Sequence, residues 1–245
     1  ANAVLGIRDS GKSYTATGMA EQLLDSKDRA GGVPITVFDP TGVWRFLRVP
    51  GGGKGYPVVV VGGMDGDLPL NPATIGKVME GALMGGVSIV VDLSGDISKT
   101  TMRKVVTDCV NVMMAKNAKY GLRHVFLEEA AQFVPQNIGD PMVYEAVERM
   151  VRVGGNMGIG VTMVNPRTQN LNKAVLELCD NLFLHRQKGT NSLKALKSWF
   201  DENGLDEPAV VDEVVRHDDH RAAGLEGQPL ELIRRQHVRG RAGEA

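Results

Sequence analysis

The sequence has few cysteines and almost no net charge. Its 245 residues include two cysteines, Cys109 and Cys179, in apolar stretches that have no metal-ligand spacing. This scarcity excludes a disulfide-rich scaffold and is typical of buried free thiols in a reducing compartment, with a structural disulfide as the alternative. Lys and Arg number 28 against 29 Asp and Glu, for a net charge of -1. Overall charge therefore gives no evidence of a nucleic-acid or membrane partner, and any basic surface must be local.

Long hydrophobic runs are also missing. No apolar run approaches the roughly 18 to 20 residues that a membrane-spanning helix needs, and no signal segment opens the chain. These absences predict a soluble, cytoplasmic protein with no membrane partner. Hydrophobic residues nevertheless make up 42% of the 245 positions, which is enough to bury one sizeable core within one large domain.

Short β-branched runs alternate with longer helical stretches along the chain, a pattern typical of parallel βαβ units. The runs are nearly all apolar, as expected where helices cover both faces of a sheet. We therefore predict an α/β fold with a doubly wound, mostly parallel sheet. Strands are expected at residues 3–5, 35–38, 58–61, 88–91, 124–127, 160–164 and 181–184, and helices at 12–26, 72–84, 98–116, 141–153, 173–179 and 192–203.

The strongest motif is G-I-R-D-S-G-K-S at residues 6–13, which fits the spacing G-x-x-x-x-G-K-[ST] between a predicted strand and a predicted helix. Backbone N–H groups of such a loop bind phosphate at a helix N-terminus; a chance glycine turn is the alternative. Lys12 would neutralise the β- and γ-phosphates, and Ser13 would ligate Mg²⁺. We expect ATP with Mg²⁺ to bind to Gly6, Ile7, Arg8, Asp9, Ser10, Gly11, Lys12, Ser13 and Tyr14.

Two adjacent carboxylates follow another predicted strand, in V-F-L-E-E-A-A-Q-F-V-P at residues 125–135. A phosphate-binding loop needs one carboxylate on the magnesium side and a second that orients the attacking water. Glu128 is predicted to serve the metal and Glu129 to act as the general base. An ordinary exposed acidic pair is the alternative. Asp92, which ends the strand before L-S-G, is a rival metal carboxylate without an adjacent partner.

Polar residues end two more predicted strands. Asp39, in F-D-P-T-G-V-W, lies where ligands of open α/β folds collect, but an Asp-Pro-Thr-Gly turn explains it equally well. Asn165, in G-V-T-M-V-N-P-R, is predicted to sense the γ-phosphate or to position water. An Asn-Pro turn is its alternative.

Seven segments, in chain order over roughly residues 4–200, resemble the HerA/FtsK superfamily of ring-forming, DNA-pumping P-loop ATPases, and most closely the bacterial HerA-like (DUF87-type) ATPase core. The resemblance therefore covers most of the chain. The segments are G-K-S-Y-T-A, F-D-P-T-G-V-W, V-V-V-G-G-M-D-G-D-L-P-L, V-V-D-L-S-G, L-E-E-A-A-Q-F-V-P, G-I-G-V-T-M-V-N-P-R and C-D-N-L-F-L-H-R.

This resemblance implies a RecA/FtsK-like fold and a hexameric ring, in which nucleotide lies between subunits and an arginine reaches the γ-phosphate of the next subunit. Arg152 and Arg186 are the candidates for this role in trans, and Arg152 is preferred because it precedes Gly154 and Gly155. Apart from Arg8, no arginine is expected to reach the γ-phosphate within its own subunit.

The chain departs from the family pattern at four points. Asp9 replaces a loop glycine and puts a carboxylate beside the phosphates, and Glu128 replaces the commoner aspartate. Gly154–Gly155 stands where a Gly-Arg pair is usual, and Asn165 where glutamine is usual. These departures concern hydrolysis more than folding, so nucleotide binding is a firmer expectation than fast turnover.

The leading hypothesis is an ATP-hydrolysing motor that translocates DNA or helps to process DNA ends, with DNA in a ring pore contacted by loops such as 51–55. Expected partners are further copies of the chain, DNA and a partner nuclease. A nucleotide-dependent assembly or signalling module is the alternative, and a small-molecule kinase is disfavoured because no lid-like arginine cluster is found. We expect the ATPase core to span residues 1–207, followed by a charged, loosely packed tail at 208–245.

Overall fold

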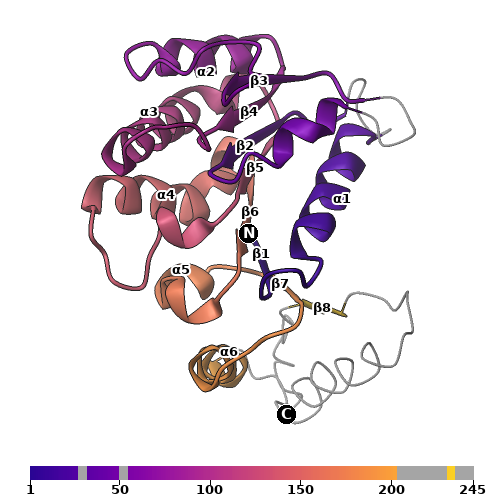
Figure 1. Ribbon diagram of the computed structural model, residues 1–245, viewed down its shortest axis with the longest axis vertical. Coiled ribbons are helices and arrows are strands. Elements are labelled where there is room, and N and C mark those ends of the chain that lie inside the picture. The colour runs from indigo at the N-terminus through magenta and orange to yellow at the C-terminus, as the bar shows by residue number, and fades with distance from the viewer. Residues whose placement is uncertain (27–31, 50–54, 203–230, 235–245) are drawn as a thin grey trace, which may run out of the picture.

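The computed structural model describes residues 1–26, 32–49, 55–202 and 231–234, which form one α/β unit around a central sheet (Figure 1). The strands are β1 (Asn2–Leu5), β2 (Ile35–Asp39), β3 (Val58–Gly62), β4 (Ser88–Asp92), β5 (Arg123–Leu127), β6 (Ile159–Asn165), β7 (Asn181–Leu184) and β8 (Glu231–Arg234). The α-helices are α1 (Lys12–Leu24), α2 (Ile75–Met84), α3 (Lys99–Lys116), α4 (Pro141–Val153), α5 (Lys173–Leu176) and α6 (Thr190–Glu202). Short 3-10 helices include η1 (Trp44–Arg48), η3 (Ala130–Gln132) and η4 (Gly154–Met157).

The sheet runs in the order β3-β4-β2-β5-β6-β1-β7-β8, and every pairing from β3 to β7 is parallel. The predicted doubly wound, mostly parallel sheet is confirmed. The carboxyl ends of these strands meet along one edge, so the segments that follow β2, β5, β6, β1 and β7 become neighbours. The strand β6 lies between β1 and β5, with Leu5 in register with Asn165 and Leu127 with Met163.

Helices cover both faces of the sheet. In Figure 1, α2, α3, α4 and α5 lie on one side, whereas α1 lies on the other. Alternate residues of each strand supply the two apolar layers: Val4 packs under α1, and its neighbours Ala3 and Leu5 pack in the larger layer on the opposite face. Trp44 of η1 belongs to the layer under α1, so η1 extends that helical cover toward β2 and β4.

The helix boundaries follow local capping chemistry. Ser98 accepts a hydrogen bond from the Thr101 N–H and starts α3, and Asp140 accepts one from Met142 at the start of α4. The helix α2 begins at Ile75, three residues later than predicted, because a turn that starts at Asn71 occupies the preceding residues.

Cys109 and Cys179 are both buried free thiols.

Two predicted features fall largely outside the described ranges. The glycine-rich loop predicted as a pore contact includes residues 51–54, which are not described. Of the predicted tail, only Glu231–Arg234 is described, and it forms β8, antiparallel to β7. Within the described ranges, no helix is long and apolar enough to cross a membrane.

Candidate functional site

The phosphate-binding motif forms the turn between β1 and α1. Asp9 adopts φ 62° and Gly11 φ 90°, so both lie in the left-handed region that lets backbone N–H groups curl around an anion. Gly11 caps α1, and Lys12 is its first residue. A Cβ atom at Gly6 would come within 2.4 Å of the His185 Cβ atom, so this position accepts only glycine.

The end of β7 anchors this loop from below. The Ile7 N–H donates to the Arg186 carbonyl at 2.9 Å, and the His185 N–H donates to the Leu5 carbonyl at 2.7 Å. The His185 ring lies 2.9 Å from the Ser10 carbonyl through Nδ1 and 3.0 Å from the Thr15 hydroxyl through Nε2. Sequence reasoning missed His185, because its partners lie some 170 residues earlier in the chain.

A cavity of about 960 Å³ opens above the loop. Eight of the nine predicted nucleotide-binding residues line it; Gly6, the ninth, is buried beneath the loop. The lining consists of Ile7, Arg8, Asp9, Ser10, Gly11, Lys12, Ser13, Tyr14, Thr41, Val43, Glu128, Glu129, Pro166, Arg167, Gln169, Lys188, Gly189, Thr190 and Asn191. Its volume lies at the upper end of the range of small-molecule sites.

The loop side of the cavity has the chemistry of a phosphate site. Lys12 is 8% exposed, so its ammonium group is held close to the loop rather than in bulk solvent. The Ser10 hydroxyl is buried and has no hydrogen-bond partner among the described residues. Tyr14 is 85% exposed at the rim, where an aromatic ring can stack on a base. Loop, lysine and helix N-terminus thus fit a triphosphate.

Glu128 follows β5 and is 2% exposed, so it is not part of an exposed acidic pair. The Trp44 indole N–H donates to its Oε2 atom at 3.0 Å. Burial raises the pKa of Glu128 from 4.5 to about 7, while the Trp44 hydrogen bond and the Lys12 charge lower this pKa. Asp39 and Glu129 act in the raising direction. Glu128 therefore lies within electrostatic reach of Lys12, as a metal-side carboxylate must.

Glu129 adopts φ 52° and lies half-buried on the wall of the same cavity. This left-handed residue ends the extended chain and starts η3, which turns the two adjacent side chains into different surroundings. Glu128 is enclosed and hydrogen-bonded, whereas Glu129 is accessible from the cavity. The pair thus has the division of environments expected of a metal carboxylate and a base.

The two other strand-end aspartates have structural roles. Asp92 lies at the end of β4, beyond β2 and away from the cavity lining, so the alternative that it serves the metal is not supported. Its Oδ1 atom accepts from the Ser94 N–H and hydroxyl. Asp39 is fully buried and holds a turn, accepting from the Thr41 N–H and hydroxyl and from the Trp44 N–H.

Asn165 differs from its predicted catalytic role. Its amide oxygen accepts from the Ala131 N–H at 2.9 Å, and its amide nitrogen donates to the Arg167 carbonyl at 2.8 Å. The side chain is 1% exposed and does not line the cavity, so it cannot contact a γ-phosphate directly in this arrangement. Instead it ties the segment after Glu129 to the end of β6.

The predicted arginines require a further correction. Arg152 lies in the last turn of α4, next to η4 and the start of β6, and so at the opposite edge of the sheet from the cavity, paired with Glu148. Arg186 follows β7 beside the loop but does not line the cavity. Besides Arg8, Arg167 also lines the cavity, so it is a second arginine that the prediction for a single subunit did not consider.

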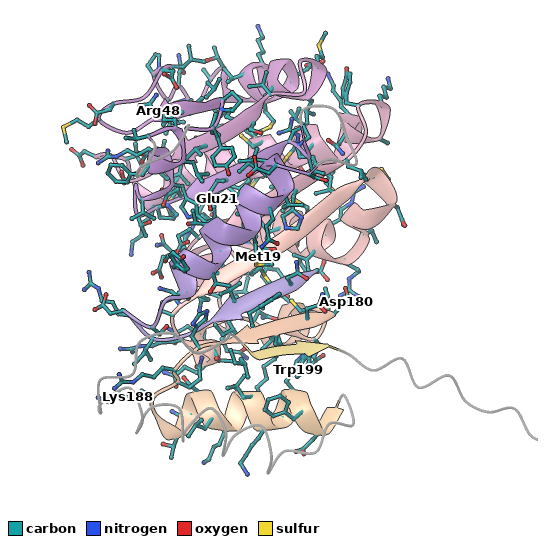
Figure 2. All side chains as sticks on the ribbon, turned by 90° about the vertical axis from the view of Figure 1, so that its right-hand side faces the viewer. Met19, Glu21, Arg48, Asp180, Lys188 and Trp199 are labelled. Atoms are coloured by element: carbon teal, nitrogen blue, oxygen red, sulfur yellow. The ribbon has the colours of Figure 1, made fainter. Side chains whose placement is uncertain are left out.

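Lys188 is a second cation that sequence reasoning missed. It lines the cavity, and Figure 2 shows Lys188 and Asp180 near opposite ends of β7. Both Arg167 and Lys188 follow strands next to β1, which is the signal that could have identified them. The cavity therefore carries cations from three segments, Arg8 and Lys12 from the loop being joined by Arg167 and Lys188.

The residues also fit a magnesium ion bound together with nucleotide. Ser13 and Glu128 both line the cavity. Among the described residues, no group of three or more His, Cys, Asp or Glu side chains could hold a metal by itself. This agrees with Mg²⁺ chemistry, because Mg²⁺ in phosphate sites takes one or two protein ligands and completes its shell with phosphate and water.

Replacing the loop lysine tests the phosphate site. Lys12→Ala is expected to lower ATP affinity by at least about 100-fold, because the loop loses the charge that offsets the phosphates. Isothermal calorimetry with ATP and Mg²⁺ measures this, with Lys77→Ala on α2 as a matched control. Equal affinity of the Lys12 variant and wild type would refute the site.

The raised pKa of Glu128 predicts a pH-dependent stability. The unfolded carboxyl loses its proton near pH 4.5 and the folded one near 7, so this group's stabilising contribution is lost as pH rises through that window. Glu128→Gln lacks the titration. Between pH 5 and pH 8, in the absence of nucleotide, the variant should gain about 2 kcal/mol in unfolding free energy relative to wild type. Urea denaturation at both pH values measures it; parallel stabilities would contradict the burial effect.

Comparison with known proteins finds no match among models of protein families and none among curated protein sequences. Solved structures do match. The DNA-packaging ATPase B204 from Sulfolobus turreted icosahedral virus is 14% identical, with a TM-score of 0.57 over 96% of this chain and 97% of that one. The genome packaging NTPase B204 from Sulfolobus turreted icosahedral virus 2, in complex with ATP-gammaS, is 14% identical, with a TM-score of 0.54 over 87% and 85%.

A bacterial protein gives a similar match. VirB4 of Thermoanaerobacter pseudethanolicus is 11% identical to this chain, with a TM-score of 0.54 over 82% of this chain and 80% of that one. At such low identities, the likeness concerns the fold. Together with the loop between β1 and α1, it shows that this chain has the doubly wound α/β fold of P-loop ATPases.

Proposed function

We propose that this chain is an ATP-binding and ATP-hydrolysing motor domain of the HerA/FtsK superfamily, which acts on DNA as a ring oligomer. One observation carries the proposal: the phosphate loop after β1 and the Glu128–Glu129 pair after β5 line one cavity, although β6 separates their strands. A chance glycine turn would have no reason to face a buried carboxylate and a second accessible one.

Each side chain has a role in this scheme. The loop N–H groups and Lys12 bind the β- and γ-phosphates, and the Ser13 hydroxyl and Glu128 hold Mg²⁺. The ion, when bound, neutralises phosphate charge. Glu129 accepts a proton from the attacking water, whose oxygen bonds to the γ-phosphorus as the bond to the leaving ADP oxygen breaks. Asn165 acts indirectly, by holding the segment after Glu129.

Action on DNA within a ring is supported by two independent likenesses. The seven sequence segments follow the order of the superfamily, and the B204 structures that share this fold are described as genome- or DNA-packaging enzymes. The exposed position of Tyr14 at the cavity rim also fits a site that a neighbouring subunit covers. In such a ring Arg152, on the far edge of its own sheet, would serve only the site of a neighbour.

The proposed activity is tested by ATP hydrolysis with and without duplex DNA. Wild type should hydrolyse ATP and accelerate at least about threefold with DNA. Glu129→Gln should bind ATP with unchanged affinity but lose about 100-fold or more in rate, because an amide cannot accept the proton. Glu145→Gln on α4 is the matched control. Tight ATP binding without turnover, with or without DNA, would favour a nucleotide-dependent assembly module instead.

The source of the catalytic arginine is tested by mixing variants. Arg152→Ala and Arg167→Ala should each slow hydrolysis if both residues act. An excess of Glu129→Gln protein should restore Arg152→Ala, because mixed interfaces combine an intact base with an intact arginine from the neighbour. The same mixing cannot restore Arg167→Ala, since no single subunit then has both groups. Failure to restore Arg152→Ala at any ratio would contradict a role for it in trans.

A further inference from the structure

The F-D-P-T-G-V-W segment, which starts with the last two residues of β2, has no role in the scheme above, yet it contributes to the wall of the cavity through Thr41 and Val43. Asp39 organises it. Its carboxylate accepts from the Thr41 N–H at 2.8 Å and hydroxyl at 2.6 Å, and from the Trp44 N–H at 2.8 Å. These three hydrogen bonds satisfy the buried Asp39 carboxylate. The turn that they form fixes the position of the Trp44 backbone, from which its side chain projects.

The Trp44 side chain is buried and packed against an aromatic ring. It is 2% exposed, and its ring centroid lies 5.1 Å from that of Phe126, in β5. Farther along η1, Arg48 donates to the Asp67 carboxylate at 2.6 Å, which holds the outer end of the same short helix. The indole is therefore pre-oriented, and little entropy remains to be lost when its N–H binds an acceptor.

That acceptor is Glu128 Oε2, at 3.0 Å. Both residues are almost fully buried, so no water can take over this hydrogen bond if the indole is removed. Trp44 takes one acceptor position of the carboxylate, and Glu128 still lines the cavity, so the carboxylate keeps acceptor positions for a ligand. A neutral donor has a further advantage over a cation here, since it orients the carboxylate without neutralising the charge that a metal needs.

We propose that Trp44 is a positioning residue for the magnesium-side carboxylate, held in turn by Asp39. The inference rests on the proposed function, because it assigns Glu128 to the metal. The Asp39 carboxylate binds the Trp44 backbone N–H, and the Trp44 indole N–H binds Glu128, so this chain of hydrogen bonds links the ends of β2 and β5. The F-D-P-T-G-V-W segment thereby supports the nucleotide site.

The test uses Trp44→Phe in the full chain, which keeps an aromatic ring against Phe126 but removes the N–H donor. ATP affinity without Mg²⁺ should remain within about twofold of wild type. The apparent affinity for Mg²⁺ in the presence of ATP, and kcat, should fall about 10- to 100-fold. Trp199→Phe, a second buried tryptophan packed on Phe200 in α6, is the control and should change neither quantity.

A double-mutant cycle separates positioning from general stability. In a Glu128→Gln background, Trp44→Phe should cause no further loss of Mg²⁺ affinity, because the carboxylate it orients is already gone. Equal losses in both backgrounds would show that Trp44 supports the fold only, and an unaltered single variant would overturn the inference. Wild type without any ATP hydrolysis would instead refute the proposed function.

A spectroscopic measurement keeps the proposal testable if Trp44→Phe does not fold. The sequence has two tryptophans, so Trp199→Phe leaves Trp44 as the sole tryptophan, whose fluorescence can be excited selectively. Adding ATP-gammaS with Mg²⁺ should change its emission, and the change should vanish in Trp199→Phe/Glu128→Gln. If Trp44 emission does not change when nucleotide is added, or changes equally in the Glu128→Gln variant, the proposed role of the Trp44–Glu128 hydrogen bond is overturned.

Discussion

The site depends on the burial of one carboxylate. Glu128 is almost inaccessible to water, and isolated ionised groups are too costly to bury without partners. The neutral Trp44 donor and the nearby positive charge on Lys12 offset part of this cost, so that the pKa of Glu128 stays near 7 rather than rising further. Such a site favours the binding of a metal cation, because a bound cation stabilises the ionised form of the carboxylate.

The sheet supplies the geometry that this balance needs. Ser10 and His185, 175 positions apart, meet because the parallel strands all end at one edge. The strand β6 keeps the loop and the glutamates one strand apart, which leaves room for a triphosphate between them. On either side, Asn165 fastens the glutamate segment and His185 fastens the loop to neighbouring strands, so the groups proposed for catalysis lie on rigid supports.

The sequence was sufficient to predict the fold and to single out the loop and the two glutamates that line one cavity, since strand alternation and local spacing carry that information. It was insufficient for contacts that depend on strand order. Asp39 and Asn165 looked like ligand-binding strand ends, yet both are consumed by hydrogen bonds within the protein. Trp44, His185, Arg167 and Lys188 have no local motif, and their proximity to the loop follows only once β2, β5, β6 and β7 are placed around β1.

Backbone strain is concentrated at the same place. Within the described ranges, the two residues other than glycine with positive φ are Asp9 and Glu129, and both line the cavity. Each such conformation costs about 1 kcal/mol or more and persists only where neighbours hold it. The Asn165 bond to Ala131 holds the segment after Glu129, and the His185 contact with Ser10 holds the residue after Asp9. The strained residues and the contacts that hold them therefore lie in the same two segments. These are the segments that must be rigid in the proposed mechanism, as expected of a preorganised phosphate site.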